Sequence, residues 1–208
     1  MFDPQTFLLF LAGALLLNIT PGPDMAFTLA TSAKSGPRAG LAAAAGVGTG
    51  AFVWAVLTAA GLAALLAASE HALPAIRIAG GAYLLYLAVK TYRQRHEAHD
   101  AKGAAGFAKA FRAGALTNLL NPKVGLFYLA FLPSFADPAA GPVWLQILAL
   151  GTVFSVSGAL VLAAVAFAAG GLRDRLAGSS ALRSRLNIAS ASVFGGLGLY
   201  LLFSRSDA

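Results

Sequence analysis

Two ionisable side chains lie inside long apolar runs of this sequence: Asp24 in the run from Phe7 to Ala33, and Lys123 in the run from Phe111 to Leu132. A charge at the centre of a membrane helix costs about 2.5–3.5 kcal/mol on insertion scales, and such charges mark functional sites by default. A carboxylate there can exchange a proton, so Asp24 is a candidate for coupling transport to protons. The alternative is a structural ion pair between Asp24 and Lys123, and the default for such residues favours function.

Each charge ends a short motif that should interrupt a helix. The two motifs are Asn18-Ile19-Thr20-Pro21-Gly22-Pro23-Asp24 and Asn118-Leu119-Leu120-Asn121-Pro122-Lys123. Proline removes a backbone donor and clashes with the preceding turn. In lipid, the freed backbone groups must be satisfied by protein or by a water-filled cavity. A break exposes amide donors at one half-helix end, where the dipole favours an anion, and carbonyls at the other. The carboxylate and the ammonium of an amino acid match these two ends.

Both motifs together form the candidate site for substrate binding or coupling. Its residues are Asn18, Pro21, Gly22, Pro23, Asp24, Asn118, Asn121, Pro122 and Lys123. The prolines and the glycine open the helices and do no chemistry. The three asparagines either bind substrate or cap freed backbone groups, and the two roles are compatible. Hydroxyl side chains within the spans could line a pathway, but hydrogen bonds to their own helix are the commoner role for Ser and Thr.

The composition is that of an integral membrane protein. The chain has 208 residues, of which 58% are hydrophobic and 11% charged, whereas a soluble domain is about 45–50% apolar and about 25% charged. A hydrocarbon core of about 30 Å needs about 20 apolar residues per helix. The length therefore allows about six spans in one all-α transmembrane domain, residues 1–208. The expected spans are residues 7–33, 39–68, 75–89, 111–132, 143–169 and 186–203, with the first and fourth broken at proline.

The same composition excludes several classes of function. The net charge is +7, but the basic residues lie in short loops, where they determine topology rather than bind nucleic acid. The chain has no cysteine, and His96 and His99 lie in a loop at a spacing too loose for a metal site. No span contains a histidine, a cysteine or a second carboxylate, so we expect neither an enzyme nor a bound cofactor. The N-terminus has no basic segment, which argues against a cleaved signal peptide.

The distribution of Lys and Arg orients the spans. Loops after spans one, three and five hold most of the basic residues, namely Lys34, Arg38, Lys90, Arg93, Arg95, Lys102, Lys109, Arg112, Arg173, Arg175, Arg183 and Arg185. The positive-inside rule places these loops in the cytoplasm and both termini outside. Spans one to three and four to six then form two halves of opposite orientation, each opening with a broken helix. Such a 3+3 inverted repeat is the best sequence pointer to the central site of a transporter.

The paired motifs resemble those of the LysE/RhtB family of amino-acid exporters. The first motif matches at Pro21, Gly22, Pro23 and Asp24, and the second at Asn118, Asn121, Pro122 and Lys123. Chain length, six spans and a polar loop between the third and fourth also fit, so the resemblance covers essentially the whole chain. It implies a multi-pass protein of the bacterial inner membrane that exports amino acids or close derivatives, driven by the proton gradient.

Four points stay open at the level of the sequence. A channel or a lipid-handling protein could use the same broken helices. The motifs do not distinguish cationic from neutral substrates, or antiport from facilitated diffusion. Small residues at Ala42, Gly46 and Gly50 let another helix pack closely, and that helix belongs either to the same chain or to a second copy in a homo-oligomer.

Overall fold

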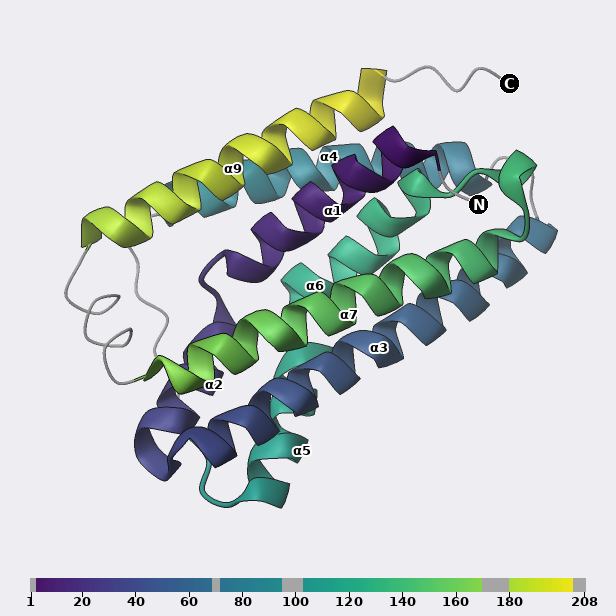
Figure 1. Ribbon diagram of the computed structural model, residues 1–208. Helices are drawn as coiled ribbons and strands as arrows, with labels where there is room; N and C mark the ends of the chain where they lie inside the picture. The colour runs from purple at the N-terminus through teal and green to yellow at the C-terminus, as the bar shows by residue number, and fades with distance from the viewer. Residues whose placement is uncertain (1–2, 69–71, 95–102, 170–179, 204–208) are drawn as a thin grey trace.

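The protein is all-helical in the parts that the computed structural model describes, which are residues 3–68, 72–94, 103–169 and 180–203. Two helix pairs dominate the molecule (Figure 1). Helix α3 (Pro37–Ala68) packs along α7 (Val143–Phe167), and α4 (Ala72–Arg93) packs along α9 (Ser180–Phe203). Helix α1 (Pro4–Ile19) lies between the two pairs and contacts both α7 and α9.

The first predicted break is present. Helix α1 ends at Ile19, α2 (Pro23–Ser35) begins after Gly22, and the two axes differ by 48°. The N–H of Thr20 still donates to the carbonyls of Leu16 and Leu17, which closes the last turn of α1. Pro23 then occupies the first position of α2, where the missing N–H costs nothing because it would have had no partner in the helix. The prolines therefore set where one half-helix stops and the next begins.

The second predicted break is also present and is followed by further irregular turns. Helix α5 (Phe107–Leu119) stops before Asn121, and α6 (Pro122–Leu126) starts with Pro122 in its first position. The chain continues as a π turn, η1 (Phe127–Phe131), and a 3-10 turn, η2 (Leu132–Phe135). Turns of the π type occur frequently at functional sites. A second 3-10 turn, η3 (Pro138–Ala140), leads into α7.

Several helix ends differ from the predicted spans. Helix α5 starts at Phe107, ahead of the predicted span at Phe111. Helix α9 starts at Ser180, ahead of the predicted span at Leu186, which places Arg183 and Arg185 in a helix instead of a loop. Hydropathy alone missed these ends because a helix can extend beyond its apolar part into a charged first turn. The predicted basic loops fall largely on residues 95–102 and 170–179, which lie outside the described residues.

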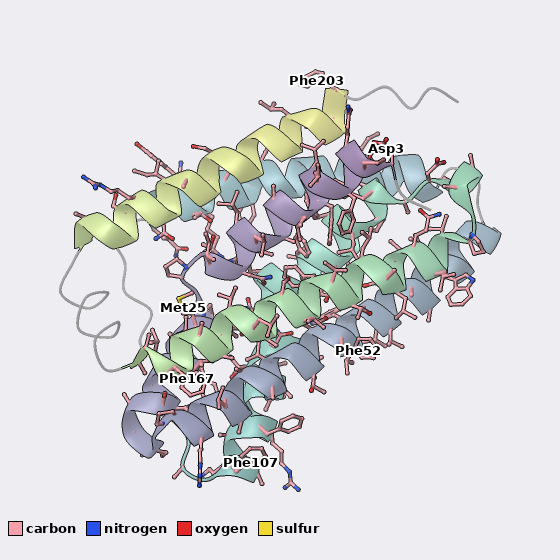
Figure 2. The ribbon with its side chains drawn as sticks, in the orientation of Figure 1. Asp3, Met25, Phe52, Phe107, Phe167 and Phe203 are labelled. Carbon is pink, nitrogen blue, oxygen red and sulfur yellow. The ribbon has the colours of Figure 1, made fainter. Side chains whose placement is uncertain are left out.

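Helix length and hydropathy identify fewer spans than the six predicted. Among the described residues, α3 over Pro37–Leu62 and α7 are long and apolar enough to cross a membrane, and the bent pair of α1 and α2 makes a third candidate. Large apolar side chains on several helices face outward, including Phe52, Phe107, Phe167 and Phe203 (Figure 2). An all-helical fold with such an exposed apolar surface is that of a membrane protein.

Glycines allow α3 and α5 to cross in close contact. A Cβ added to Gly46 would lie 2.0 Å from the carbonyl oxygen of Phe111, and one added to Gly114 would lie 2.4 Å from that of Ala43. Small residues permit such an approach of two backbones. The small-residue stripe predicted on the second span, Ala42, Gly46 and Gly50, is thus used within the chain, by α5. It therefore gives no indication of a homo-oligomer.

Candidate functional site

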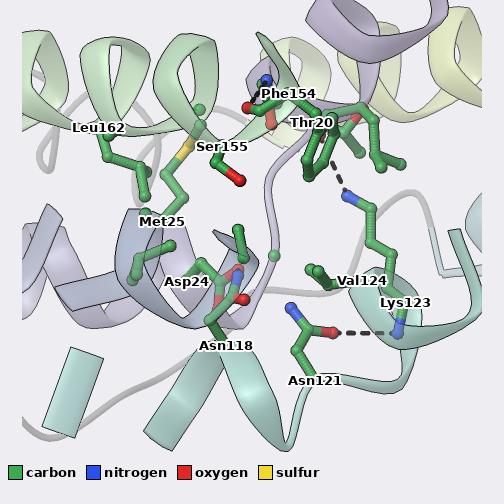
Figure 3. Close-up of a pocket in the computed structure, with 18 residues that line it drawn as sticks. Thr20, Asp24, Met25, Asn118, Asn121, Lys123, Val124, Phe154, Ser155 and Leu162 are labelled. Atoms are coloured by element: carbon green, nitrogen blue, oxygen red, sulfur yellow. Dashed lines mark hydrogen bonds between the residues drawn. The ribbon is translucent and has the colours of Figure 1, made fainter. Parts of the chain in front are cut away.

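A cavity of about 50 Å³ lies where the two breaks meet (Figure 3). Its lining includes six of the nine predicted site residues, namely Asn18, Gly22, Asp24, Asn118, Asn121 and Lys123. Pro21 and Pro23 are not part of the lining, and Pro122 forms the first position of α6. The structure therefore brings together the two segments that the sequence predicted to form the site, although 94 positions of chain separate Asp24 from Asn118.

Asp24 lies in the first turn of α2, at the end where the helix dipole favours an acid. The Nδ2 of Asn118, in the last turn of α5, donates a hydrogen bond of 2.8 Å to Oδ2 of Asp24. The second carboxylate oxygen, Oδ1, is buried and has no hydrogen-bond partner among the described residues. A buried acceptor without a donor is costly, so Oδ1 is a position at which a ligand with an N–H or O–H group would be stabilised.

Lys123 lies in the first turn of α6 and reaches across to the first break. Its backbone N–H donates to Oδ1 of Asn121 at 3.1 Å, and its Nζ donates to the carbonyl oxygen of Leu17 at 3.4 Å. That carbonyl belongs to the last turn of α1, where the helix dipole favours a cation. The ammonium of Lys123 therefore caps the half-helix that the first break leaves open.

The structural ion pair that was the alternative to a functional role for the two charges is not present. Within the described residues, no salt bridge joins Asp24 to Lys123: the carboxylate accepts from Asn118, and the ammonium donates to Leu17. Each charge is instead held by a polar group from the other break. The reason is geometric, because the end of each half-helix supplies a dipole and hydrogen-bonding groups that satisfy the nearby charge. The two charges remain separate groups that line one cavity.

The asparagines have distinct roles. Asn121 caps α6, because its Oδ1 accepts the N–H of Lys123. Asn18 holds α1 to α7, since its Nδ2 donates to Oγ of Ser157 at 3.0 Å and to the carbonyl of Phe154 at 3.4 Å. Asn118 donates to Asp24 rather than to backbone. Capping is thus confirmed for Asn121, whereas Asn18 and Asn118 position other elements.

A polar cluster next to the cavity joins the π turn to α7. The hydroxyl of Tyr128 donates to the carbonyl of Gly151 at 3.0 Å and lies 2.9 Å from Oγ of Ser155. Ser155 also donates to Gly151 at 2.7 Å, within its own helix. The expectation that hydroxyls bond to their own helix is likewise confirmed for Thr49 and Thr117.

Sequence reasoning missed most of one wall of the cavity, although Ser155 was one of the hydroxyl residues considered as pathway lining, and it does line the cavity. Helices α3 and α7 supply this wall, chiefly through apolar or small residues, and Met25 of α2 joins them. The members from α3 and α7 are Val47, Gly48, Ala51, Phe154, Ser155, Gly158, Ala159 and Leu162. Apart from the hydroxyl of Ser155, these side chains carry no polar group that would distinguish them from ordinary packing residues. The small residues along α3 and α7, which permit a close approach of two helices, were the one signal in the sequence that these helices meet.

The site offers hydrogen-bonding and charged groups rather than metal ligands. Among the described residues, no group of three or more His, Cys, Asp or Glu side chains could hold a metal ion. A carboxylate with a free buried oxygen and an ammonium group line the same cavity. Such a pair suits a ligand that carries both a positive and a negative end.

Comparison with known proteins places the chain in a family of transporters. It is 33% identical to an uncharacterized membrane protein of Pseudomonas aeruginosa over 90% of this chain and 88% of the relative. It is 31% identical to the leucine efflux protein of Salmonella typhimurium over 71% of each chain, and 30% identical to the homoserine/homoserine lactone efflux protein of the same organism over 94% of this chain and 95% of that one. No solved structure gives a significant match. The LysE type translocator family matches residues 15–205, so the chain belongs to this family and is a membrane transporter rather than an enzyme.

Proposed function

We propose that the protein exports amino acids, or close derivatives, from the cytoplasm in exchange for protons, and that the substrate binds between the two helix breaks. One observation carries this proposal. Asp24 and Lys123 line the same cavity, and they form no salt bridge with each other. Two relatives that the chain resembles along most of its length are named for efflux of leucine and of homoserine or its lactone. Leucine and homoserine each carry an amine and a carboxylate, as the proposed site requires, whereas a homoserine lactone carries the amine and an ester carbonyl in place of the carboxylate.

The two ends of an amino acid have separate partners in this proposal. The ammonium donates to Oδ1 of Asp24, which is buried and without a donor among the described residues. The carboxylate accepts from Nζ of Lys123, which has three N–H donors and leaves the Leu17 carbonyl that it contacts at 3.4 Å. The gain is a hydrogen bond between two opposite charges in place of a long one to a neutral carbonyl.

In this proposal, a cavity of the size found in the structure is a closed state of the cycle. One water molecule needs about 10–15 Å³ of cavity volume. The cavity of about 50 Å³ therefore holds only a few waters. An amino acid enters only after the surrounding helices separate. Separation is easiest at contacts between the breaks, because a few hydrogen bonds from Asn118 and Lys123 hold them together.

Asp24 is the proton carrier in the proposed cycle. With Asp24 ionised, its carboxylate binds the ammonium of the substrate; protonation from outside removes the negative charge and releases the substrate outward. The proton then leaves Asp24 toward the cytoplasm, and the next substrate binds. The Asp24 carboxylate binds either a proton or the ammonium of the substrate, never both at once. Antiport requires that proton binding and substrate binding exclude each other in this way.

The proposal includes a six-span 3+3 inverted repeat with both termini outside in the inner membrane. The packing of α3 on α7 and of α4 on α9 supports it, because each pair joins elements in corresponding positions of the two halves. The broken elements, α1 with α2 and α5 with α6, also occupy corresponding positions. Alternating access would then arise from rocking of one half against the other around the fixed site.

Efflux from proteoliposomes tests the function. Vesicles that contain the purified protein are preloaded with a mixture of labelled amino acids, and efflux is followed with and without an imposed pH gradient. We expect saturable, selective efflux that the gradient accelerates. Efflux that does not saturate would support a channel instead, and no amino-acid efflux from folded, inserted protein would overturn the proposal.

Substitution of Asp24 by Asn tests the coupling. The amide keeps the size of the side chain and can still accept from Asn118, so we expect the variant to fold and to show no gradient-driven efflux. The conservative Asp24→Glu variant should retain part of the coupling because it keeps the carboxylate. Normal gradient-driven efflux by the Asp24→Asn protein would remove this residue from the coupling mechanism.

A further inference from the structure

We infer that the site selects neutral amino acids with aliphatic side chains, because the wall opposite its charged groups is apolar and contains no group to pair a second charge. This inference rests on the proposed function and adds the substrate class. The sequence motifs alone did not distinguish cationic from neutral substrates. The distinction comes from the wall that α3 and α7 supply, which the motifs do not include.

The direction of the substrate side chain follows from the positions of its two charged ends. Figure 3 shows Met25 and Leu162 together on one side of the cavity, with Lys123 and Asn121 on the other. Met25, Val47 and Leu162 belong to one cluster of buried apolar side chains. A substrate whose carboxylate contacts Lys123 and whose ammonium contacts Asp24 has its side chain directed toward this cluster.

A cationic side chain would have no partner there. Asp24 and Lys123 are the charged residues in the lining of the cavity, and Asp24 already binds the α-ammonium of the substrate. The distal charge of a lysine or arginine substrate would therefore be buried among methyl and thioether groups. Burial of an unpaired charge is strongly unfavourable, so the wall rejects cationic side chains.

A hydroxyl on the substrate gains little from the same wall. Ser155 is the hydroxyl that α7 contributes, and it is already engaged with the carbonyl of Gly151 at 2.7 Å and with the hydroxyl of Tyr128 at 2.9 Å. A hydroxylated side chain gives up hydrogen bonds to water and meets mainly apolar atoms. An aliphatic side chain loses no hydrogen bonds and removes its own apolar surface from water.

Room for a branched aliphatic group comes from the seam between α3 and α7. A Cβ added to Gly48 would lie 2.8 Å from Cβ of Ala159, so the two helices touch here through a glycine and an alanine. On the far side of the seam lies an open groove of about 290 Å³ that shares Gly48, Ser155 and Ala159 with the cavity. A small separation of the helices at this thin wall enlarges the cavity without moving a large side chain.

The test compares three substrates in the same vesicles. Proteoliposomes of the full-length protein are preloaded with labelled leucine, homoserine or lysine at equal low concentration, and initial efflux rates are measured under one pH gradient. We expect leucine to leave about tenfold or more faster than homoserine, since apolar pockets discriminate by about this factor per missing group, and lysine to be slower still. Lysine or homoserine efflux as fast as that of leucine would overturn the substrate class and leave the exporter intact. No efflux of any of the three would overturn the proposed function itself.

A pair of variants on α7 locates the selectivity. Leu162 is 4% exposed and lines the cavity, whereas Leu160 is 65% exposed. Leu162→Ala enlarges the aliphatic wall, so we expect the ratio of phenylalanine to leucine efflux to rise by about tenfold, while Leu160→Ala leaves this ratio unchanged. An unchanged ratio in a folded Leu162→Ala protein would overturn the assignment of this wall. If Leu162→Ala does not fold, the three-substrate comparison with the wild-type protein decides the proposal.

Discussion

At the scale of single residues, Lys123 has two roles that both depend on its Nζ, and substitution by Met removes both. Its Nζ caps α1 at the carbonyl of Leu17, and in the proposed cycle it binds the substrate carboxylate. We expect Lys123→Met to raise the substrate concentration for half-maximal efflux by about 10- to 100-fold, because a hydrogen bond to a charged group is worth about 1.5–3 kcal/mol. Saturation curves in proteoliposomes measure this. Lys109→Met, at an exposed position of α5, is the control and should leave the curve unchanged; equal curves for both variants would contradict the role.

Gly22 offers a substitution that changes the site without straining the backbone. Its φ of −169° is extended, which any residue adopts, and an added Cβ would lie 3.8 Å from Nζ of Lys123. We therefore expect Gly22→Ala to fold normally and to slow efflux, because the methyl group partly covers the ammonium. Thermal unfolding in detergent and efflux rates, measured on the same preparation, separate the two effects. A large fall in melting temperature would show that Gly22 is needed for the fold instead.

The residue scale also shows where prediction from sequence succeeded and failed. Both breaks were predicted because proline acts locally on its own helix. The hydrogen-bond partners of Asp24 and Lys123 were not predicted, because they depend on how α1, α2, α5 and α6 cross in space. The sequence suggested a direct ion pair, and the structure has Asn118 and the Leu17 carbonyl in its place.

At the scale of elements, the crossing of α3 and α5 depends on glycine. A Cβ on Gly46 would lie 2.0 Å from the carbonyl oxygen of Phe111, and backbone cannot move aside cheaply. We expect Gly46→Ala to lower the melting temperature in detergent or to prevent folding. The matched control is Gly61→Ala in the same helix, where an added Cβ meets nothing within 4 Å, and which should stabilise the helix by about 0.5–1 kcal/mol. Equal melting temperatures for the two variants would contradict this account.

The wall of the cavity illustrates why the element scale limits sequence reasoning. Val47, Gly48, Ala159 and Leu162 lie in long apolar helices, and nothing in their residue types separates a cavity wall from lipid-facing or packing positions. Which face of α3 meets α7 is decided by the fit of small residues along both helices. Charged and proline-containing motifs are visible in one sequence because they break a pattern. The residues of an apolar subsite continue the run of apolar residues in their helix, so they can be identified only in the folded protein.

At the scale of the whole molecule, the proposed topology can be tested because the chain contains no cysteine. Ala105 precedes α5 and Ala140 ends the turn η3, and both are exposed. The proposed orientation puts Ala105 in the cytoplasm, within the loops rich in Lys and Arg, and Ala140 outside. We expect a membrane-impermeant maleimide to label Ala140→Cys in intact spheroplasts and Ala105→Cys only after the membrane is broken.

This experiment bears on the inverted repeat as well as on the orientation of the protein. The inverted repeat requires the two broken elements to enter the membrane from opposite sides, so Ala105 and Ala140, which flank the second broken element, must lie on different sides. Labelling of both from outside would contradict a crossing between them and with it the inverted repeat. Labelling with the opposite sidedness would keep the repeat and reverse the orientation. The direction of transport would not change, because in the proposed antiport the inward proton gradient drives the substrate outward in either orientation.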